Sequence, residues 1–306
     1  MSAPASLANS AVLSNAGAAG PPGAPEAPRP RTFEELAALG EDRLDAARGA
    51  ALIARDAYAS LDVEGLLGRL DDLAAPLVAR ELSALPLDAQ AIEIGRHLYE
   101  VVGFRGNEAD YYDPKNSLLV DVLDRKLGIP ITLALVYVEV ARRAGVVAHG
   151  VGFPGHFLVR IDAADPAANA APVFVDPFFG GRILDRPALE RLLRRAAGAA
   201  QTLADEHLAP ASARAILVRM LVNLKWIYTT RGDLARAHLA LDRMVTLTPE
   251  SVAAVRERGM LAAKLGAVEA ARADLARSLE LQPEAADAGA IRARIEELGA
   301  TKRQLN

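Results

Sequence analysis

The sequence predicts an α+β domain followed by a purely helical segment, and three features of the apolar pattern lead to this fold class. Between residues 32 and 102, apolar side chains recur every three or four positions, which is typical of amphipathic helices. Beyond Gly145 the apolar period shortens toward two, which indicates β-strands. In the last third of the chain, a pattern with a period of 34 residues occurs twice.

The composition is that of a globular protein with an apolar core. Hydrophobic residues make up 51% of the chain and charged residues 24%. The formal net charge of -4 gives no reason to expect nucleic acid or an anionic membrane as a partner. Cysteine is absent, so these 306 residues cannot form a disulfide, a thiolate metal site or a cysteine nucleophile. No set of histidines has metal-ligand spacing, and we expect neither a metal nor a cofactor.

The N-terminal residues 1–31 are rich in Ala, Pro, Gly and Ser, which predicts a disordered lead-in. They contain no lysine or arginine before Arg29 and no compact apolar stretch, so they do not resemble a secretory signal. The most apolar run elsewhere, Ile129 to Val140, is about 12 residues long, whereas a membrane span needs roughly 20. We therefore expect a cytoplasmic protein without a membrane span.

Three parts follow the lead-in. Residues 32–115 have a helical pattern, with a capped start at Thr32 and a loop around the cluster Asp110-Tyr-Tyr-Asp113. Residues 116–205 form the middle part, and residues 206–306 form the repeat region. The elements expected in the middle part are helices from Asn116 to Lys126 and from Pro130 to Arg143, and strands over Val146–Phe153, His156–Ile161 and Val173–Asp176.

The repeat rests on four residue types that recur at the same offset. Gly232, Ala237, Leu241 and Pro249 return as Gly266, Ala271, Leu275 and Pro283. Thirty-four residues is the period of the tetratricopeptide repeat, whose glycine, alanine, large apolar and proline positions fall here. We place two repeats at residues 218–251 and 252–285, followed by a closing helix. Two units are fewer than the roughly three that a free-standing solenoid needs, so we expect both to pack on the middle part.

Three phrases of the middle part carry a family resemblance. They are Leu127-Gly-Ile-Pro-Ile131, Gly152-Phe-Pro-Gly-His-Phe-Leu-Val-Arg160 and Phe174-Val-Asp-Pro-Phe178. With the repeats, they resemble the bacterial transglutaminase-like proteins with a C-terminal tetratricopeptide segment, named after the invasion regulator Sir B. The resemblance covers roughly residues 44–298. It implies a transglutaminase-like (papain-like) core with N-terminal helices, followed by the helical repeat segment.

The resemblance also implies where a Cys, His, Asp triad would lie. His156 takes the position of the base, and Asp176 takes the position of the residue that orients it. Counting back about four helical turns from Gly145 puts the missing cysteine at or near Pro130, which has no side-chain nucleophile. The expected strand places His156 on the opposite face from Phe157. A purely structural His–Asp pair that closes a polar gap between strand ends is the alternative interpretation.

Four further side chains are candidates for binding. Tyr111 and Tyr112 either line a cleft or pack their own loop, and packing is favoured. Asn116 either caps the helix that follows or reaches the site, and capping is favoured. Thr132 carries a hydroxyl close to the empty nucleophile position, although it does not align with the cysteine.

Two functions remain open from the sequence. The absence of cysteine favours a non-enzymatic scaffold that binds a protein or peptide through the tetratricopeptide surface. The alternative is an enzyme that uses His156 and Asp176 as a general acid/base pair in hydrolysis or isomerisation, with Thr132 as an unconventional nucleophile in one variant. An accessible pocket at a hydrogen-bonded His156 would favour the enzyme, and a sealed His156 would favour the scaffold.

Overall fold

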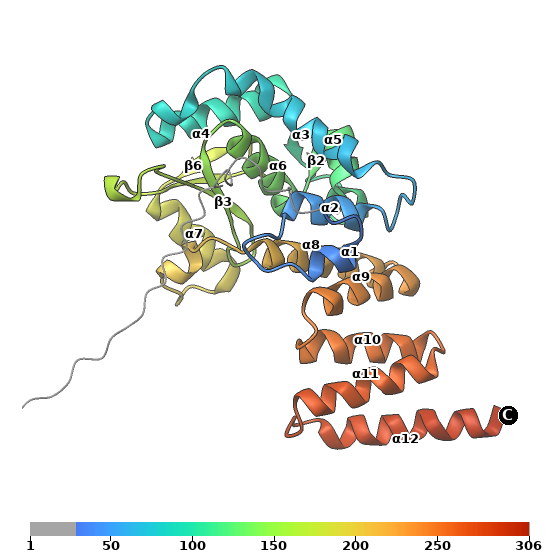
Figure 1. Cartoon of the computed structure of the whole chain (residues 1–306). Coiled ribbons are helices and arrows are strands. Elements are labelled where there is room, and N and C mark those ends of the chain that lie inside the picture. Colours follow the sequence, from blue (N-terminus) through green and yellow to red (C-terminus); the bar gives the residue numbers. More distant parts are fainter. Residues whose placement is uncertain (1–28, 306) are drawn as a thin grey trace, which may run out of the picture.

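The computed structural model describes residues 29–305 and shows an α+β domain joined to a row of helices (Figure 1). Most of the expected lead-in, up to residue 28, lies outside the described residues. Side chains are described up to residue 300. Within this part of the chain, no helix combines the length and the apolar character that crossing a membrane requires.

The N-terminal part is helical, as its apolar period predicts. Its elements are α1 (Phe33–Ala37), α2 (Ala46–Ala54), α3 (Val63–Val78), the short 3-10 helix η1 (Leu82–Ala84), α4 (Leu87–Gly95) and the π-helical turn η2 (Arg96–Val101). The Thr32 hydroxyl accepts the backbone N–H of Glu35, and the Glu35 carboxylate accepts the N–H of Thr32. This reciprocal capping satisfies two backbone donors, so the predicted start at Thr32 is correct.

Helix α6 (Pro130–Arg143) lies in the centre of the domain. Every residue from 130 to 141 is buried, which explains the long apolar run in the sequence. The helix ends where the N–H of Val146 reaches the carbonyl of Ala141, with Gly145 at a φ of +80°. Glycine accepts this left-handed conformation readily, and this bonding pattern commonly closes a helix. The predicted ends of this helix agree with the structure.

The main sheet is antiparallel and has the order β3-β4-β5-β6. Its strands are β3 (Val147–Val151), β4 (Leu158–Asp162), β5 (Val173–Asp176) and β6 (Arg182–Leu184). Val159 and Ile161 pack into the large core that contains α6, whereas Leu158 packs into a smaller cluster beneath α7 (Arg186–Ala197). Helices therefore cover both faces of the sheet.

Short elements connect these layers. They are the parallel pair β1 (Arg105–Gly106) and β2 (Leu127–Gly128), helix α5 (Leu119–Arg125), and the 3-10 turns η3 (Pro114–Ser117), η4 (Pro166–Ala168) and η5 (Asp205–Leu208). Strand β6 and the pairing of β1 with β2 are additions to the elements expected from the sequence. Strands of two or three residues are too short to show an alternating pattern.

His156 lies in a tight turn before β4, and not on the strand as predicted. Its backbone N–H donates to the carbonyl of Phe153 at 2.9 Å, and Gly155 has a φ of +68°. A Cβ at Gly155 would lie 2.7 Å from the Cβ of Ala196 on α7. The turn therefore depends on a glycine, both for its backbone conformation and for the close approach of α7.

The C-terminal part is a row of antiparallel helices, as the repeat predicts. They are α8 (Ala213–Thr230), α9 (Leu234–Leu247), α10 (Val252–Lys264), α11 (Val268–Leu281) and α12 (Ala288–Leu305). The first helix of each pair is followed by a glycine with positive φ, Gly232 at +75° and Gly266 at +78°. These two glycines lie 34 positions apart because each makes the same turn between the two helices of its repeat.

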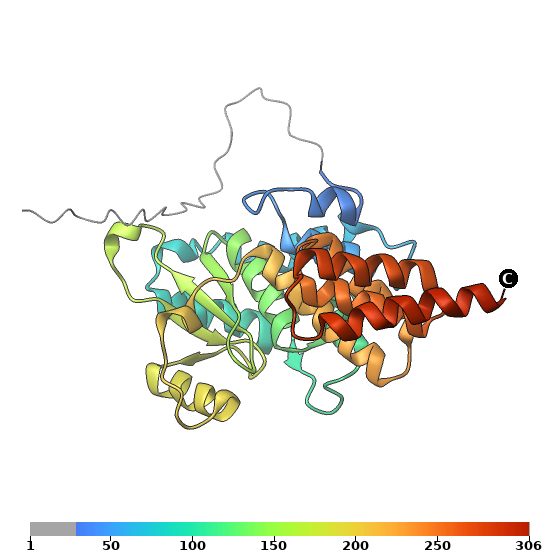
Figure 2. The ribbon, with the colours of Figure 1, turned by 90° about the horizontal axis from the view of Figure 1, so that it is seen from below.

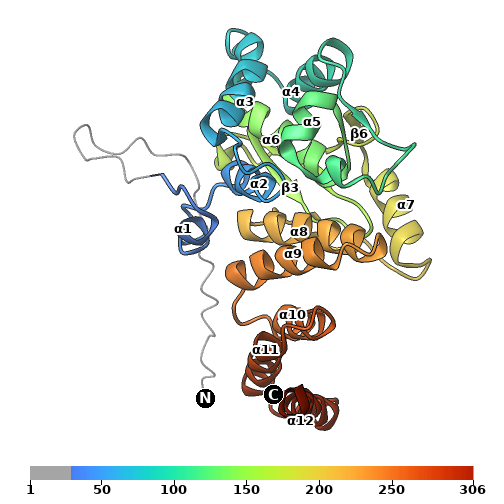
Figure 3. The same ribbon diagram turned by 90° about the vertical axis from the view of Figure 1, so that its right-hand side faces the viewer.

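In the described part of the chain, the first helix pair packs directly on the domain, and α10 extends the large core next to α9 with Ala254 and Leu261. Leu217 of α8 is fully buried in the large core, and a Cβ at Gly49 of α2 would lie 2.3 Å from it. Leu275 of α11 and Ile291 of α12 belong to a separate apolar cluster. Helices α10 to α12 extend away from the domain (Figures 1 and 3), which corrects the expectation that both repeats pack on it.

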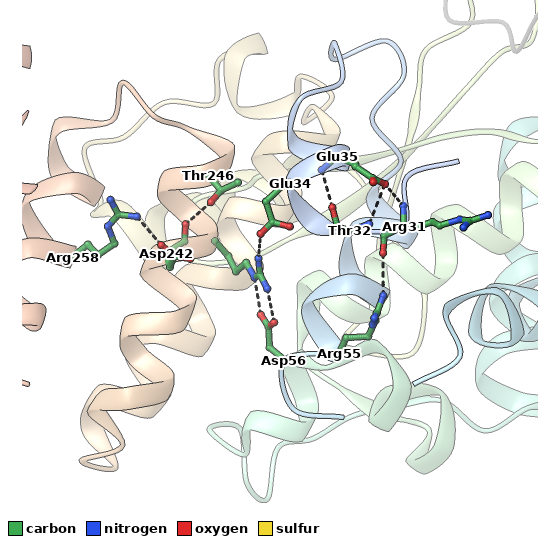
Figure 4. A network of polar contacts seen from close by, with 10 residues as sticks. Arg31, Thr32, Glu34, Glu35, Arg55, Asp56, Asp242, Thr246 and Arg258 are labelled. Carbon is green, nitrogen blue, oxygen red and sulfur yellow. Dashed lines mark hydrogen bonds and ion pairs between the residues drawn. The ribbon is translucent and has the colours of Figure 1, made fainter. Parts of the chain in front are cut away.

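Polar contacts fix the first pair against the N-terminal helices. The Arg243 guanidinium of α9 bonds Asp56 at 2.9 Å, pairs with Glu34 and lies 5.1 Å over the ring of Phe33. Figure 4 shows Glu34 and Asp56 turned toward the repeat helices. Because these contacts join α1 and the turn after α2 to α9, the first repeat is part of the domain rather than an appendage.

Candidate functional site

His156 and Asp176 form a hydrogen-bonded pair. The Nε2 atom of His156 lies 2.9 Å from Oδ1 of Asp176. The histidine is 7% exposed and the aspartate is fully buried. Since the carboxylate can only accept, Nε2 carries the proton, and Nδ1 is the nitrogen that could face a ligand. The structure brings the two residues together as the sequence suggests.

Asp176 also organises the loop that follows it. Its carboxylate accepts the backbone N–H groups of Phe178 at 3.1 Å and Phe179 at 3.2 Å, and it pairs with Arg182 at 3.2 Å. Burial alone would raise the pKa of Asp176. The hydrogen bond from His156, with the N–H of Phe179 and the charge of Arg182, instead lowers this pKa below its usual value. The carboxylate is therefore ionised at neutral pH.

Two aromatic rings flank His156. The ring centroids of Phe178 and Phe179 lie 6.4 Å and 6.3 Å from that of the histidine. Phe178 is buried and Phe179 is exposed, and the Arg182 guanidinium lies 5.0 Å over the Phe179 ring. Neither Phe179 nor Arg182 was among the site residues predicted from the sequence. The glycines at 180 and 181, both with positive φ, were the signal for a tight turn that brings this loop back to the histidine.

The start of α6 presents no nucleophile. Pro130 occupies the first helical position and is buried. The Thr132 hydroxyl donates to the carbonyl of Asn116 at 2.7 Å and accepts the N–H of Ile129 at 3.1 Å. These two bonds use the donor and one acceptor position of a fully buried hydroxyl. Thr132 therefore anchors the helix start, and the geometry offers no support for it as a nucleophile or a ligand contact.

Asn116 does not cap the following helix, which corrects the favoured interpretation. Residue 118 occupies the N-cap position of α5. The Asn116 amide instead donates to the carbonyl of Asp110 at 2.7 Å, and its oxygen accepts from Asn107 at 3.0 Å. The side chain is fully buried. A buried amide with three partners holds the shape of the 107–113 loop, and no surface of it remains for a ligand.

Tyr111 and Tyr112 pack against each other and against both neighbouring parts of the molecule. Their ring centroids are 5.2 Å apart, in an edge-to-face arrangement. Tyr111 lies 5.9 Å from Phe178, and Tyr112 lies 4.5 Å from Trp226 on α8. The loop is therefore packed by its tyrosines, as favoured. The loop also connects the His156 site to the first repeat helix through Trp226, which was not among the predicted site residues.

A cleft lies close to this site but does not include the pair. It has a volume of about 460 Å³ and is lined by residues 182–195 of β6 and α7, Arg182 among them. Neither His156 nor Asp176 lines it. Within residues 29–305, no group of three or more His, Asp or Glu side chains is arranged to hold a metal ion.

Comparison with protein families agrees with this fold. Residues 64–222, more than half of the chain, match the model of the transglutaminase-like superfamily. The chain belongs to the transglutaminase-like superfamily. Residues 224–296 of this superfamily member match a tetratricopeptide repeat model. The predicted α+β, transglutaminase-like core followed by tetratricopeptide helices is thus confirmed.

This transglutaminase-like protein has bacterial relatives of similar length. It is 38% identical to a UPF0162 protein of Xylella fastidiosa strain 9a5c over 276 residues, which cover 87% of this chain and 94% of the relative. It is 35% identical to the UPF0162 protein PA3419 of Pseudomonas aeruginosa over 179 residues, 58% of this chain and 63% of the relative.

A shorter match occurs in an animal protein. The chain is 37% identical to mouse F-box only protein 21 over 116 residues, which cover 37% of this chain and 18% of that protein. No solved structure matches the chain at a significant level. These relatives support the architecture of this transglutaminase-like protein, and their names assign no reaction to it.

Proposed function

We propose that this protein is a peptide-binding scaffold that acts in the cytoplasm. A transglutaminase-like domain with tetratricopeptide repeats supports a protein-binding role in general, and the lack of cysteine removes thiol chemistry. The observation that carries the proposal is an aromatic surface, defined here as the exposed side chains of Tyr111, Tyr112, Trp226 and Met260. More specifically, we propose a regulatory role related to that of the invasion regulator Sir B.

The aromatic surface spans the junction between the domain and the repeats. Tyr112 and Trp226 are 53% and 45% exposed although their rings lie 4.5 Å apart. The Arg231 guanidinium, just after α8, donates to the carbonyl of Tyr112 at 3.1 Å and fixes the loop there. Trp226 and Met260 are 34 positions apart in the sequence, so the repeat places both on the same side of the helical row. Clustered exposed apolar side chains of this kind mark interaction surfaces.

The charge around the surface favours an acidic peptide with an aromatic or aliphatic anchor. Burial raises the pKa of Tyr111, and the positive charge of Arg219 opposes that rise. Arg219 is exposed on α8, about two helical turns before Trp226, and Arg231 follows the same helix. A carboxylate on the peptide would pair with these guanidinium groups while its apolar anchor packs on the rings.

In this proposal the His156–Asp176 pair has a structural role. The carboxylate joins the histidine turn, two backbone N–H groups and Arg182. This loop carries Phe178, whose ring packs on Tyr111. The pair therefore supports the aromatic surface from behind, and this role does not require proton transfer.

The enzyme remains the second candidate, and one observation favours it. A carboxylate held ionised by a low pKa, hydrogen-bonded to a histidine, is the arrangement of a general acid/base pair. The small exposed fraction of His156 and its absence from the lining of the adjacent cleft argue against substrate access. The scaffold is therefore the function that the geometry supports best.

A library of synthetic peptides of defined sequence, screened against the immobilised protein, tests the proposal. Acidic peptides with an aromatic or aliphatic anchor should bind. Trp226→Ala should weaken this binding at least tenfold, and His156→Ala should change it no more than about threefold. Ile92→Ala serves as the matched control, since Ile92 is an exposed apolar residue on α4. Two results together would instead support the enzyme. His156→Ala would abolish the cellular phenotype of the protein at unchanged stability, and Trp226→Ala would bind the peptides as wild type does.

A further inference from the structure

The cleft between β6 and α7 has an unusual concentration of positive charge. Arg182, Arg191 and Arg195 line it, and among its lining residues only Asp185 is acidic. The Asp185 carboxylate is already engaged, because it accepts the backbone N–H of Ala188 at the start of α7. The remaining lining is apolar, namely Ile183, Leu184, Ala188 and Leu192. The cleft thus combines several hydrogen-bond donors with an apolar wall.

Arg191 and Arg195 lie four positions apart on one face of α7. Like charges at this spacing repel each other weakly, and an anion bound between them would reduce this repulsion. Among residues 29–305, neither guanidinium has an ion-pair partner. Arg186 and Arg194 on the same helix differ, because both pair with Glu190, at 3.3 Å and 3.8 Å. Glu190 therefore neutralises the two arginines that lie outside the cleft, and it does not pair with the two arginines that line the cleft.

Arg182 is held in place at the other side of the cleft. Its guanidinium bonds Oδ2 of Asp176 at 3.2 Å and lies over the ring of Phe179. A guanidinium has five N–H donors, so these contacts leave donors that can face the cleft. A side chain already fixed by its neighbours loses little conformational freedom when a ligand binds.

We propose that this cleft binds a small anion with an apolar body. Its phosphate or carboxylate group accepts hydrogen bonds from Arg182, Arg191 and Arg195, since planar guanidinium groups bind such oxyanions in a bidentate manner. Its apolar part packs on Ile183 and Leu192. The volume of about 460 Å³ is within the range of small-molecule sites.

This site does not depend on the peptide-binding proposal. In Figure 2, α7 (yellow) and the last repeat helices (red) lie toward opposite ends of the molecule. The aromatic surface is at the junction with α8, and none of its four side chains lines the cleft. Loss of either site can therefore be measured without loss of the other.

Isothermal titration calorimetry on the full chain tests the site with three probes that share a ring: phenyl phosphate, phenylacetate and neutral phenol. Wild type should bind at least one of the two anions and not phenol, and the preferred anion identifies the oxyanion group. The double variant Arg191→Gln/Arg195→Gln should weaken this binding at least tenfold. The matched control Arg186→Gln/Arg194→Gln removes the same charge from the same helix and should stay within twofold of wild type.

Three results would overturn the proposal: no binding of either anion by wild type, equal binding of phenol, or equal losses in the two double variants. Glutamine keeps the helix propensity and much of the stem of arginine. Both variants should therefore keep the wild-type circular dichroism spectrum. Raised salt should weaken anion binding by wild type, because part of the cleft faces solvent.

Discussion

The Nε2 atom of His156 donates to Oδ1 of Asp176 across 2.9 Å, and the same oxygen accepts the backbone N–H groups of Phe178 and Phe179. Oδ2 bonds Arg182. One buried carboxylate thus ties the histidine turn, the loop after β5 and the start of β6 together. In a protein without cysteine, this connection explains why a His–Asp pair is stable as part of the fold.

The first prediction concerns removal of that carboxylate. Asp176→Ala should lower the free energy of unfolding by about 3–5 kcal/mol, because it leaves several buried or half-buried donors without an acceptor. Urea denaturation measures this loss. Asp185→Ala, which removes only the N-cap of α7, should cost about 1 kcal/mol. Equal losses in the two variants would show that Asp176 is no more than a local cap.

The second prediction concerns acid stability. The pKa of Asp176 is lowered in the folded protein, so its contribution is fully present above the unfolded pKa of about 3.9 and is lost as the pH falls through the folded value. Asp176→Asn cannot titrate at this position. The stability advantage of wild type over this variant should shrink as the pH falls below about 4. A difference independent of pH down to acid denaturation would contradict an ionised Asp176.

The third prediction concerns the buried hydroxyl at the start of α6. Thr132→Val should cost about 1–3 kcal/mol of stability, because the carbonyl of Asn116 and the N–H of Ile129 both lose their partner. Thr132→Ser keeps the hydroxyl and should be the less destabilised variant in the same thermal or urea unfolding measurement. If serine is as damaging as valine, the methyl group rather than the hydrogen bonds matters at this position.

The fourth prediction separates the two helix pairs. Leu217→Ala opens a cavity in the large core and should destabilise the whole domain by about 2–5 kcal/mol. Leu275→Ala lies in the separate cluster of α11 and α12, so its effect should be confined to these helices and to α10. Hydrogen exchange measured by mass spectrometry distinguishes the outcomes. Faster exchange in α6 after Leu275→Ala would show that the second repeat is coupled to the core after all.

Elements with a local signal were predictable from the sequence. Helix α6 has a proline at its first position and a glycine just past its end, so local chemistry sets both bounds. The turns at Gly232 and Gly266 recur because each repeat needs the same left-handed residue. Strand β4 was predicted to begin two residues too early, because apolar alternation continues through a turn that only the conformation of Gly155 reveals.

Long-range contacts were not predictable in the same way. Asparagine is a common helix cap, but the Asn116 side chain forms its three hydrogen bonds with the neighbouring loop instead. Tyr112 and the end of α8 meet although Arg231 lies 119 positions away in the chain. Arg191 and Arg195 line a cleft only because β6 lies next to α7. None of these pairings leaves a periodic signal in one sequence.

The amino-acid sequence alone shows that the protein lacks a thiol. It also shows the helical and repeat periods and the positions of His156 and Asp176. Those features depend on residue type and local spacing, which a sequence states directly. The tertiary structure decided that the aspartate is a buried four-way acceptor and that Thr132 is committed to hydrogen bonds. Buried polar groups take the partners that packing brings within about 3 Å, and packing joins segments that are distant in the chain.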